Sequence, residues 1–269
     1  MTKIKPTIIT SLPELMTYVE ANCKPDLVLF RGQPEDKVLL PKVARPEFRT
    51  RIRSGDPLRT ERAMFDDFRR KAVTYLPREP ANSWEWLALA QHHGLCTRLL
   101  DWTLNPLAAI WFTVENPPVG NAAGVVWHFD VRPKDEELEG DPFNTSATKV
   151  FQPRHITARI MSQSGWFTVH KYLDGKGKFI PLESNTAFSK RLRKLEIPAT
   201  AFSNLRRELD RCNVNGASLY GGVDGLCKHL NWLNTLGSDE DPKKVYRRAR
   251  FHRPAKPPTM PQNRPELPN

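Results

Sequence analysis

Apolar residues recur at helical spacing in several segments of the chain. Residues 57–76 place Ala63, Met64, Phe68 and Ala72 between charged residues, which is typical of an amphipathic helix. Ser11 and Glu14 have the spacing of a capping box, so a helix is expected over 11–22. Further helices are expected over 83–94 (from a Ser83 cap to a Gly94 stop), from Asn105-Pro106 onward, over 201–211 and within 218–233.

Compact apolar runs predict the strands. Residues 27–33 and 124–131 each form a short β-type run, and 158–173 is expected to hold a strand pair around Gly165. Residues 134–148 are polar and are expected to form a surface loop. These elements together predict an α+β fold, with a mixed sheet and flanking helices.

The composition changes near residue 238. Seven Lys and Arg residues lie between 243 and 256, and six Pro residues lie between 254 and 268. Such a segment cannot bury a core, so the chain is divided into a single globular domain, 1–237, and a basic, Pro-rich tail, 238–269. Nucleic-acid contacts in this tail are expected from Lys243, Lys244, Arg247, Arg248 and Arg250.

Composition narrows the class of protein. With 39% hydrophobic residues and seven Trp, a chain of 269 residues is expected to fold. The net charge of +11 favours phosphate-rich partners. The four Cys show no CxxC spacing and are expected to be reduced, in a cytoplasmic protein. No signal peptide is recognised, and no apolar run approaches the roughly 20 residues of a membrane span.

Arg31 and Gly32 end the apolar strand of 27–33. The planar guanidinium binds phosphate or carboxylate through two parallel hydrogen bonds, and a glycine lets a backbone or a ligand approach closely. Arg31 could instead form a structural ion pair with a buried acid.

Two adjacent histidines, His92 and His93, end the helix of 83–94, where the helix dipole favours a cationic imidazole. Neighbouring helical residues do not share a face, so at most one of them points into a given site. A site with two His ligands would use i, i+4 spacing, and no HExxH motif or Cys pair is present, so no metal is expected. The alternative for either histidine is a hydrogen-bonded core or capping residue.

Asp101 and Thr103 are expected at the turn into the helix that opens at Asn105-Pro106. They either belong to a chemical site or cap that helix, and Arg98 could form a buried ion pair with Asp101. Near Gly165, Gln163 and the aromatic pair Trp166-Phe167 could receive a planar ring, or the rings could pack in the core. The sequence holds no Walker loop, GxGxxG motif or Ser/His/Asp elbow.

Four segments, in the same order, resemble the FRG domain family, which is named after its Phe-Arg-Gly motif. They are FRG at 30–32, LAQHHGLCTRLLDWTLNPLAAIWF at 89–112, RIMSQSGWFTVHK at 159–171 and SLYGGVDGLCKHL at 218–230. The resemblance covers residues 11–233, and its long second segment is specific. Members of the family are largely of unassigned function.

A more distant resemblance joins two segments to mono-ADP-ribosyltransferases of the Arg-Ser-Glu type. LVLFRG is similar to their strand ending in (Y/F)RG, and LLDWTLNPLAAIWF is similar to their Ser-Thr-Ser strand and the helix after it. Asp101-Trp102-Thr103 stand where Ser-Thr-Ser would. The third element has no Glu, so the acceptor would be oriented by His93, Asp101, His155 or Gln163.

This second resemblance implies a split sheet and NAD as a substrate. Arg31 would bind the NAD phosphates, and Thr103 with Gln91 or His93 would hold the nicotinamide ribose. The expected catalytic residues are Asp101, His93 and Gln163. The expected NAD-binding residues are Arg31, Gly32, Gln91, Arg98, Thr103, Trp166 and Phe167.

The function predicted from the sequence is NAD-dependent ADP-ribosylation of nucleic acid, with RNA favoured over DNA. Such an enzyme would be a toxin or phage-defence effector, which a neutralising antitoxin protein could accompany. Two other classes compete with it. One is a nucleic-acid or protein-binding module without catalysis, in which Arg31, Arg98 and the basic run of 243–256 contact phosphates. The other is a histidine-dependent ribonuclease, which would cleave RNA without NAD.

Overall fold

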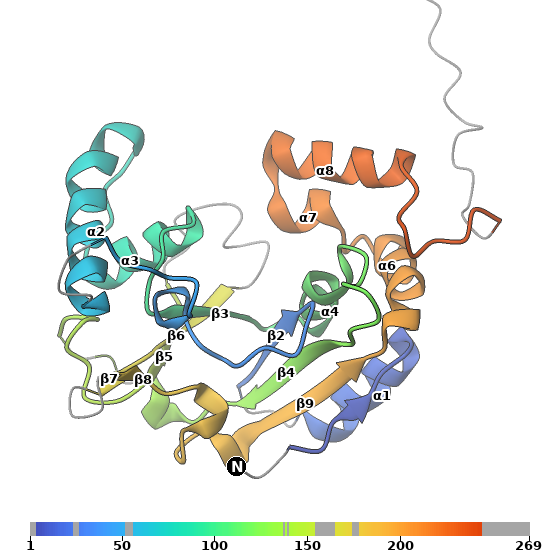
Figure 1. Cartoon of the computed structure of the whole chain (residues 1–269), viewed down its shortest axis with the longest axis horizontal. Helices are drawn as coiled ribbons and strands as arrows, with labels where there is room; N and C mark the ends of the chain where they lie inside the picture. Colours follow the sequence, from blue (N-terminus) through green and yellow to red (C-terminus); the bar gives the residue numbers. More distant parts are fainter. Residues whose placement is uncertain are drawn as a thin grey trace, which may run out of the picture. The chain divides into compact units, whose positions relative to one another are not determined.

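The computed structural model describes residues 4–23, 27–51, 56–136, 138, 140–153, 165–173 and 178–243. The chain divides into two compact units, Met1–Asp239 and Glu240–Asn269. All helices and strands described below belong to the first unit (Figure 1).

A seven-stranded sheet in the order β1-β9-β4-β2-β3-β6-β5 is the centre of the fold. β1 pairs with β9 in parallel, and every other neighbouring pair is antiparallel. β7 (Tyr172–Leu173) and β8 (Lys178–Phe179) form a separate two-stranded sheet. The seven strands are β1 (Thr7–Ile8), β2 (Val28–Gln33), β3 (Leu99–Thr103), β4 (Gly124–Asp130), β5 (Lys149–Phe151), β6 (Gly165–Val169) and β9 (Leu192–Ile197). The predicted α+β class with a mixed sheet is therefore confirmed.

Seven α-helices are described with this sheet. They are α1 (Leu12–Asn22), α2 (Pro57–Ala72), α3 (Ser83–His92), α4 (Pro106–Val114), α6 (Phe202–Arg211), α7 (Gly216–Tyr220) and α8 (Gly222–Asn234). Ser11 caps α1 as predicted. The cap of α3 is Asn82 rather than Ser83, because the Asn82 side chain accepts from the amide of Glu85.

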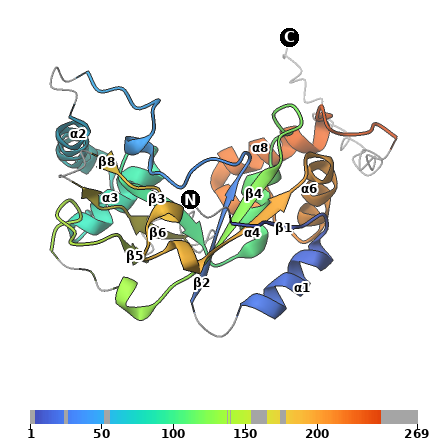
Figure 2. The ribbon, with the colours of Figure 1, turned by 60° about the horizontal axis from the view of Figure 1, so that its bottom comes forward.

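Helices cover one face of the sheet in two groups. α1, α4 and α6 pack on β2, β4 and β9 through residues such as Tyr18, Phe30 and Leu195. α2 and α3 pack on β3, β5 and β6 through Phe65 and Phe167 among others. In Figures 1 and 2, α2 and α3 lie at the left end of the sheet, while α8 lies toward its right half.

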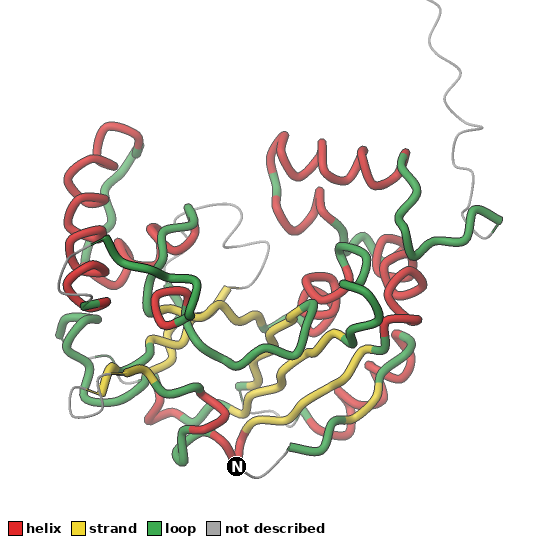
Figure 3. The backbone as a smooth tube through the Cα atoms, in the orientation of Figure 1, coloured by secondary structure: helices red, strands yellow, loops and turns green. Residues whose placement is uncertain are grey.

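Among the described residues, no long helix lies over the other face of the sheet. Trp102, Trp127, Phe129 and Trp166 form a core there with residues of loops and short 3-10 turns, including Leu39 and Leu182. Loops and short turns pass over this side in the tube view (Figure 3). Both faces of the central strands are therefore buried, which explains their nearly continuous apolar sequence.

The junction between β2 and β3 is narrow. The two strands share one register pair, Phe30 with Thr103, whereas β2 shares six pairs with β4 and β3 shares five with β6. The sheet is continuous through this single pair, and the split sheet implied by the ADP-ribosyltransferase resemblance stays a prediction. Beyond that pair, Arg31 of β2 and Asp101 of β3 line a cavity.

Candidate functional site

A cavity of about 630 Å³ opens beside the β2–β3 junction. This volume is within the range of ~300–1,000 Å³ that small-molecule sites occupy. β2 and β3 supply one wall, and the end of α3 supplies another. The described lining residues are Phe30, Arg31, Gly32, Lys42, Gln91, His92, His93, Gly94, Asp101, Trp102, Thr103, Phe112 and Tyr220. Six residues predicted from the sequence are among them: Arg31, Gly32, Gln91, His93, Asp101 and Thr103.

The way α3 ends brings its last residues over β3. His93 is the C-cap residue, and Gly94 follows with a φ of 92°. The amide of Leu95 then donates to the oxygen of Ala90 at 3.0 Å, which closes the last turn. Because the chain changes direction between α3 and β3 within these few residues, Gln91 and His93 line the same cavity as Asp101.

Arg31 connects the two strands of the junction. Its Nη1 donates to the main-chain oxygen of Asp101 at 2.8 Å and lies 3.6 Å from Oδ2 of the same residue. The side chain is 15% exposed, and burial lowers the pKa of Arg31 despite the opposing effect of Asp101. Its Nε is buried without a hydrogen-bond partner. Arg31 thus forms a structural ion pair while its guanidinium still lines the cavity.

A directed chain of hydrogen bonds holds the carboxylate of Asp101. The amide of Leu99 donates to Oγ1 of Thr97, so the Thr97 hydroxyl is left to donate to Oε1 of Gln91, at 2.7 Å. The Gln91 Nε2 therefore faces Asp101 and donates to its carboxylate, at 3.1 and 3.3 Å. Thr97 and Gln91 are buried, whereas the Asp101 side chain is 55% exposed. Asp101 is an oriented carboxylate that remains open to the cavity.

Gly32 allows a close approach of backbone. A Cβ at this position would lie 1.9 Å from the oxygen of Ala109 and 2.6 Å from Oγ1 of Thr113. α4 therefore rests directly on β2 here. The predicted need for a small residue at Gly32 is explained by this helix.

Thr103 and Asn105 form the turn from β3 into α4. The oxygen of the Asn105 side chain accepts from the amides of Leu107 and Ala108, so Asn105 is the cap. The alternative that Asp101 or Thr103 caps α4 is wrong in this respect. Oγ1 of Thr103 accepts from the amide of Asn105 and stabilises the turn before the helix.

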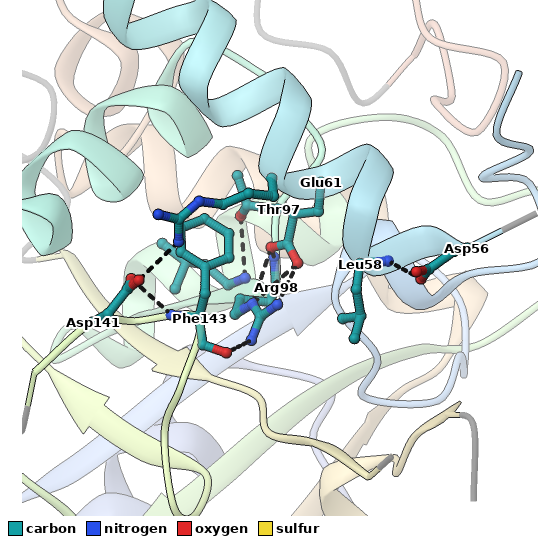
Figure 4. A network of polar contacts seen from close by, with 9 residues as sticks. Asp56, Leu58, Glu61, Thr97, Arg98, Asp141 and Phe143 are labelled. Atoms are coloured by element: carbon teal, nitrogen blue, oxygen red, sulfur yellow. Dashed lines mark hydrogen bonds and ion pairs between the residues drawn. The ribbon is translucent and has the colours of Figure 1, made fainter. Parts of the chain in front are cut away.

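Arg98 lies away from the cavity, in a buried network between α2 and β3 (Figure 4). Its side chain is 2% exposed and pairs with Glu61, which is 1% exposed, at 2.7 Å. Arg98 also donates to the oxygen of Phe143 at 3.1 Å. The interpretation of Arg98 as partner of Asp101 is therefore wrong, because Glu61 accepts its Nε and Nη2 and Arg31 lies beside Asp101. A role of Arg98 in binding NAD is not supported by this position.

Trp166 and Phe167 also lie outside the cavity lining. Trp166 is 8% exposed and packs in the core of the loop-covered face, while Phe167 is 4% exposed and packs under α3. Their β6 strand pairs with β3 along its full length, so their rings are covered by protein. The structure thus places both in the core, as the alternative interpretation expected.

Some predicted residues lie outside the described residues. These are His155, Gln163, Lys244, Arg247, Arg248 and Arg250. Lys243 is described, is exposed and belongs to the second unit of the chain.

The cavity also contains residues that were not predicted for it. Lys42 begins a short 3-10 helix, Lys42–Ala44, Phe112 belongs to α4, and Tyr220 ends α7. The Tyr220 hydroxyl donates to Glu115 at 2.6 Å, and its ring lies edge-on to Phe112. Tyr220 lies within SLYGGVDGLCKHL, the fourth segment that resembles the FRG domain family. That resemblance was the sequence signal that could have indicated a role for Tyr220 in the site.

The described residues contain no group of three or more His, Cys, Asp or Glu side chains placed to hold a metal ion. None of their helices has the length and apolar character needed to cross a membrane.

Comparisons with known proteins identify one family. No curated protein and no solved structure matches the chain. The model of the FRG domain matches residues 26–121, which include β2, α2, α3, β3 and α4. Every described residue of the cavity lining except Tyr220 lies in this range. The chain is therefore similar to the FRG domain over this segment.

Proposed function

We propose that the cavity binds NAD and that the protein transfers ADP-ribose from NAD to a nucleic acid, RNA in preference to DNA. The observation that supports this most is the convergence of Arg31, Gln91, His93, Asp101 and Thr103 on one cavity. These residues come from β2, the end of α3 and β3, and all five were predicted from the sequence as site residues.

Two cations in the cavity suit the diphosphate of NAD. Arg31 presents part of its guanidinium at the junction of β2 and β3, and Lys42 is exposed on the same lining. Guanidinium groups bind phosphate oxygens through paired hydrogen bonds, and lysine adds a compact charge. Phe112 and Tyr220 provide the aromatic wall for the nicotinamide ring that was expected from Trp166 and Phe167.

Asp101 is the carboxylate among the described lining residues. In the proposed reaction the bond between the ribose C1′ and the nicotinamide nitrogen breaks, and the electron pair leaves with nicotinamide. Positive charge develops on the ribose, and an oriented carboxylate stabilises that charge without having to reorganise. Gln91 would act as a positioning residue, because its amide holds Asp101 and is itself held by Thr97.

An acceptor nitrogen or oxygen then forms a bond to C1′ and releases a proton. His93 lines the cavity at the end of α3 and would take that proton. The net charge of +11 supports an anionic acceptor. Modification of RNA would interfere with growth, which agrees with a toxin or phage-defence effector and with control by a neutralising protein.

The test uses the full chain, NAD labelled in its adenylate part, and RNA. Transfer of label to RNA is expected, with strong loss in Asp101→Asn, whose side chain is half exposed and not needed for the core. Arg31→Ala is the second variant, with its folding checked by circular dichroism. Absence of transfer by the folded protein, or equal transfer by all three proteins, would overturn the proposal. Cleavage of RNA without NAD would instead indicate the ribonuclease, and binding without modification would indicate the binding module.

A further inference from the structure

A second cavity adjoins the first one. It has a volume of about 660 Å³ and shares His92, His93 and Tyr220 with the first. Its other described lining residues come from the α7–α8 turn and from α8: Gly221, Gly222, Asp224, Gly225, Cys227, Lys228 and Asn231. The function proposed above uses the shared residues His93 and Tyr220 but none of the residues that line only the second cavity.

The side of α8 that faces the second cavity is polar. Asp224, Lys228 and Asn231 are spaced i, i+4 and i+7, so they lie on one face of the helix and line the cavity together. An ordinary surface helix turns its apolar stripe inward and its polar residues to solvent. Asp224, Lys228 and Asn231 are all exposed, so this polar stripe is accessible to a ligand in the cavity.

The apolar residues of α8 lie on other sides of the helix. Trp232 packs against Trp111 of α4, with ring centroids 6.1 Å apart, and holds the helix in place. Val223, Leu226 and Leu230 are 74%, 47% and 46% exposed. The packing of Trp232 fixes one side of α8, and Asp224, Lys228 and Asn231 line the second cavity from another side.

Tyr220 lies where the two cavities meet. Nζ of Lys228 is 4.2 Å from the centroid of the Tyr220 ring. The imidazole of His92, which also lines both cavities, lies edge-on to that of His93. The second cavity thus combines an ammonium group, planar rings, a carboxylate and an amide. These groups match the phosphate, the face and the hydrogen-bonding edge of a nucleotide.

We infer that the second cavity binds a nucleotide of single-stranded RNA, and that this nucleotide is the acceptor of ADP-ribose. The role as acceptor rests on the proposed function, whereas the binding itself does not. Lys228 contacts the phosphate, Tyr220 and His92 stack on the base, and Asp224 with Asn231 contacts its exocyclic groups. The acceptor atom of the base attacks C1′ as nicotinamide leaves, and its proton passes to His93, which lines both cavities.

Binding is measured first, without NAD, on the full chain and a single-stranded RNA that carries 4-thiouridine. Lys228→Glu is expected to weaken binding by about tenfold or more, because it replaces an attraction to phosphate with a repulsion. Leu230→Gln is the matched control on the same helix and is expected to bind like the parent protein. Ultraviolet cross-links are expected at Tyr220 or His92. Equal binding by Lys228→Glu, or cross-links confined to residues 244–269, would overturn the inference.

Labelled NAD is then added to separate the two proposals. If RNA binds at α8 but no label is transferred, the proposed function fails and the nucleotide site stands. Label on RNA that is undiminished by Lys228→Glu supports the proposed function and overturns the acceptor site. Label on protein side chains in place of RNA also overturns the acceptor site.

Discussion

Nη1 of Arg31 donates to the main-chain oxygen of Asp101 and so ties β2 to β3 next to the single register pair of these strands. Arg31→Ala is expected to lower the free energy of unfolding by about 1.5–3 kcal/mol, the usual effect of losing a hydrogen bond from a charged group. Urea denaturation measures this change. Lys42→Ala, an exposed cation of the same cavity, is the control and should change stability by less than about 0.5 kcal/mol. Equal effects of the two substitutions would contradict a bridging role for Arg31.

Gly32 supports a second prediction, about packing. In Gly32→Ala the new Cβ would meet the oxygen of Ala109 at 1.9 Å, and α4 would have to shift. Overpacking of this kind costs about 1–3 kcal/mol, and a contact with backbone places this case at the upper end. The measurement is thermal unfolding. Gly120→Ala is the comparison, since a Cβ there meets nothing within 4 Å and only its φ of 58° opposes the change. The packing account fails if Gly120→Ala is the more damaging of the two.

Thr97 offers a test of how Asp101 is positioned. Thr97→Val removes the hydroxyl that orients Gln91, and should lower the kcat of the proposed ADP-ribosyl transfer by about tenfold to 100-fold. The KM for NAD should change little, because Thr97 is not part of the cavity lining. Thr97→Ser keeps the hydroxyl and should restore kcat. An unchanged kcat in Thr97→Val would show that Gln91 does not position Asp101.

The buried pair of Glu61 and Arg98 predicts a strong coupling. Either single substitution, Glu61→Leu or Arg98→Met, leaves an unpaired buried charge and should cost about 3–5 kcal/mol. The double variant removes both charges and should be more stable than the sum of the two losses predicts. A double-mutant cycle by urea denaturation measures the difference. Simple additivity would show that the two side chains act independently.

His170 predicts how stability depends on pH. Burial lowers the pKa of His170 from 6.5 to about 3, and the hydroxyl of Thr168 lies 3.1 Å from its Nε2. Between these two pKa values the unfolded chain binds a proton that the folded chain does not, so stability falls as the pH falls below about 6.5. The slope contributed by one such group approaches about 1.4 kcal/mol per pH unit. Urea denaturation at pH 7 and pH 5 measures it. His170→Gln should flatten this dependence, and an unchanged slope would assign it to other groups.

The sequence predicted well those elements whose pattern is local. The helices around 57–72 and 106–114 and the strands 28–33 and 124–130 were expected from apolar spacing and from caps within a few residues. β9 was not predicted as a strand. Its Leu192 packs on one face of the sheet and Leu195 on the other, while Lys194 lies 5.7 Å from the Trp127 ring, so no simple alternation appears.

The candidate site was predictable in part for the same reason. Gln91, Asp101 and Thr103 lie within one short segment, so the turn between α3 and β3 was enough to bring them together. The partner of Arg98 is Glu61, 37 residues earlier, and nothing in the spacing of charges indicated that pairing. Tyr220 reaches the cavity from α7, more than a hundred residues after Asp101, through tertiary packing alone.

The strand order also determines which piece of the chain must be expressed to obtain a folded FRG domain. The matched segment, 26–121, holds β2 and β3 but none of β4, β6 and β9, which lie on either side of them in the sheet. A protein cut at those boundaries would present two unpaired strand edges and bare apolar side chains such as Leu29 and Leu100, a combination that favours aggregation. The segment matched by the family model is therefore smaller than the piece of chain that must be made to obtain a folded protein.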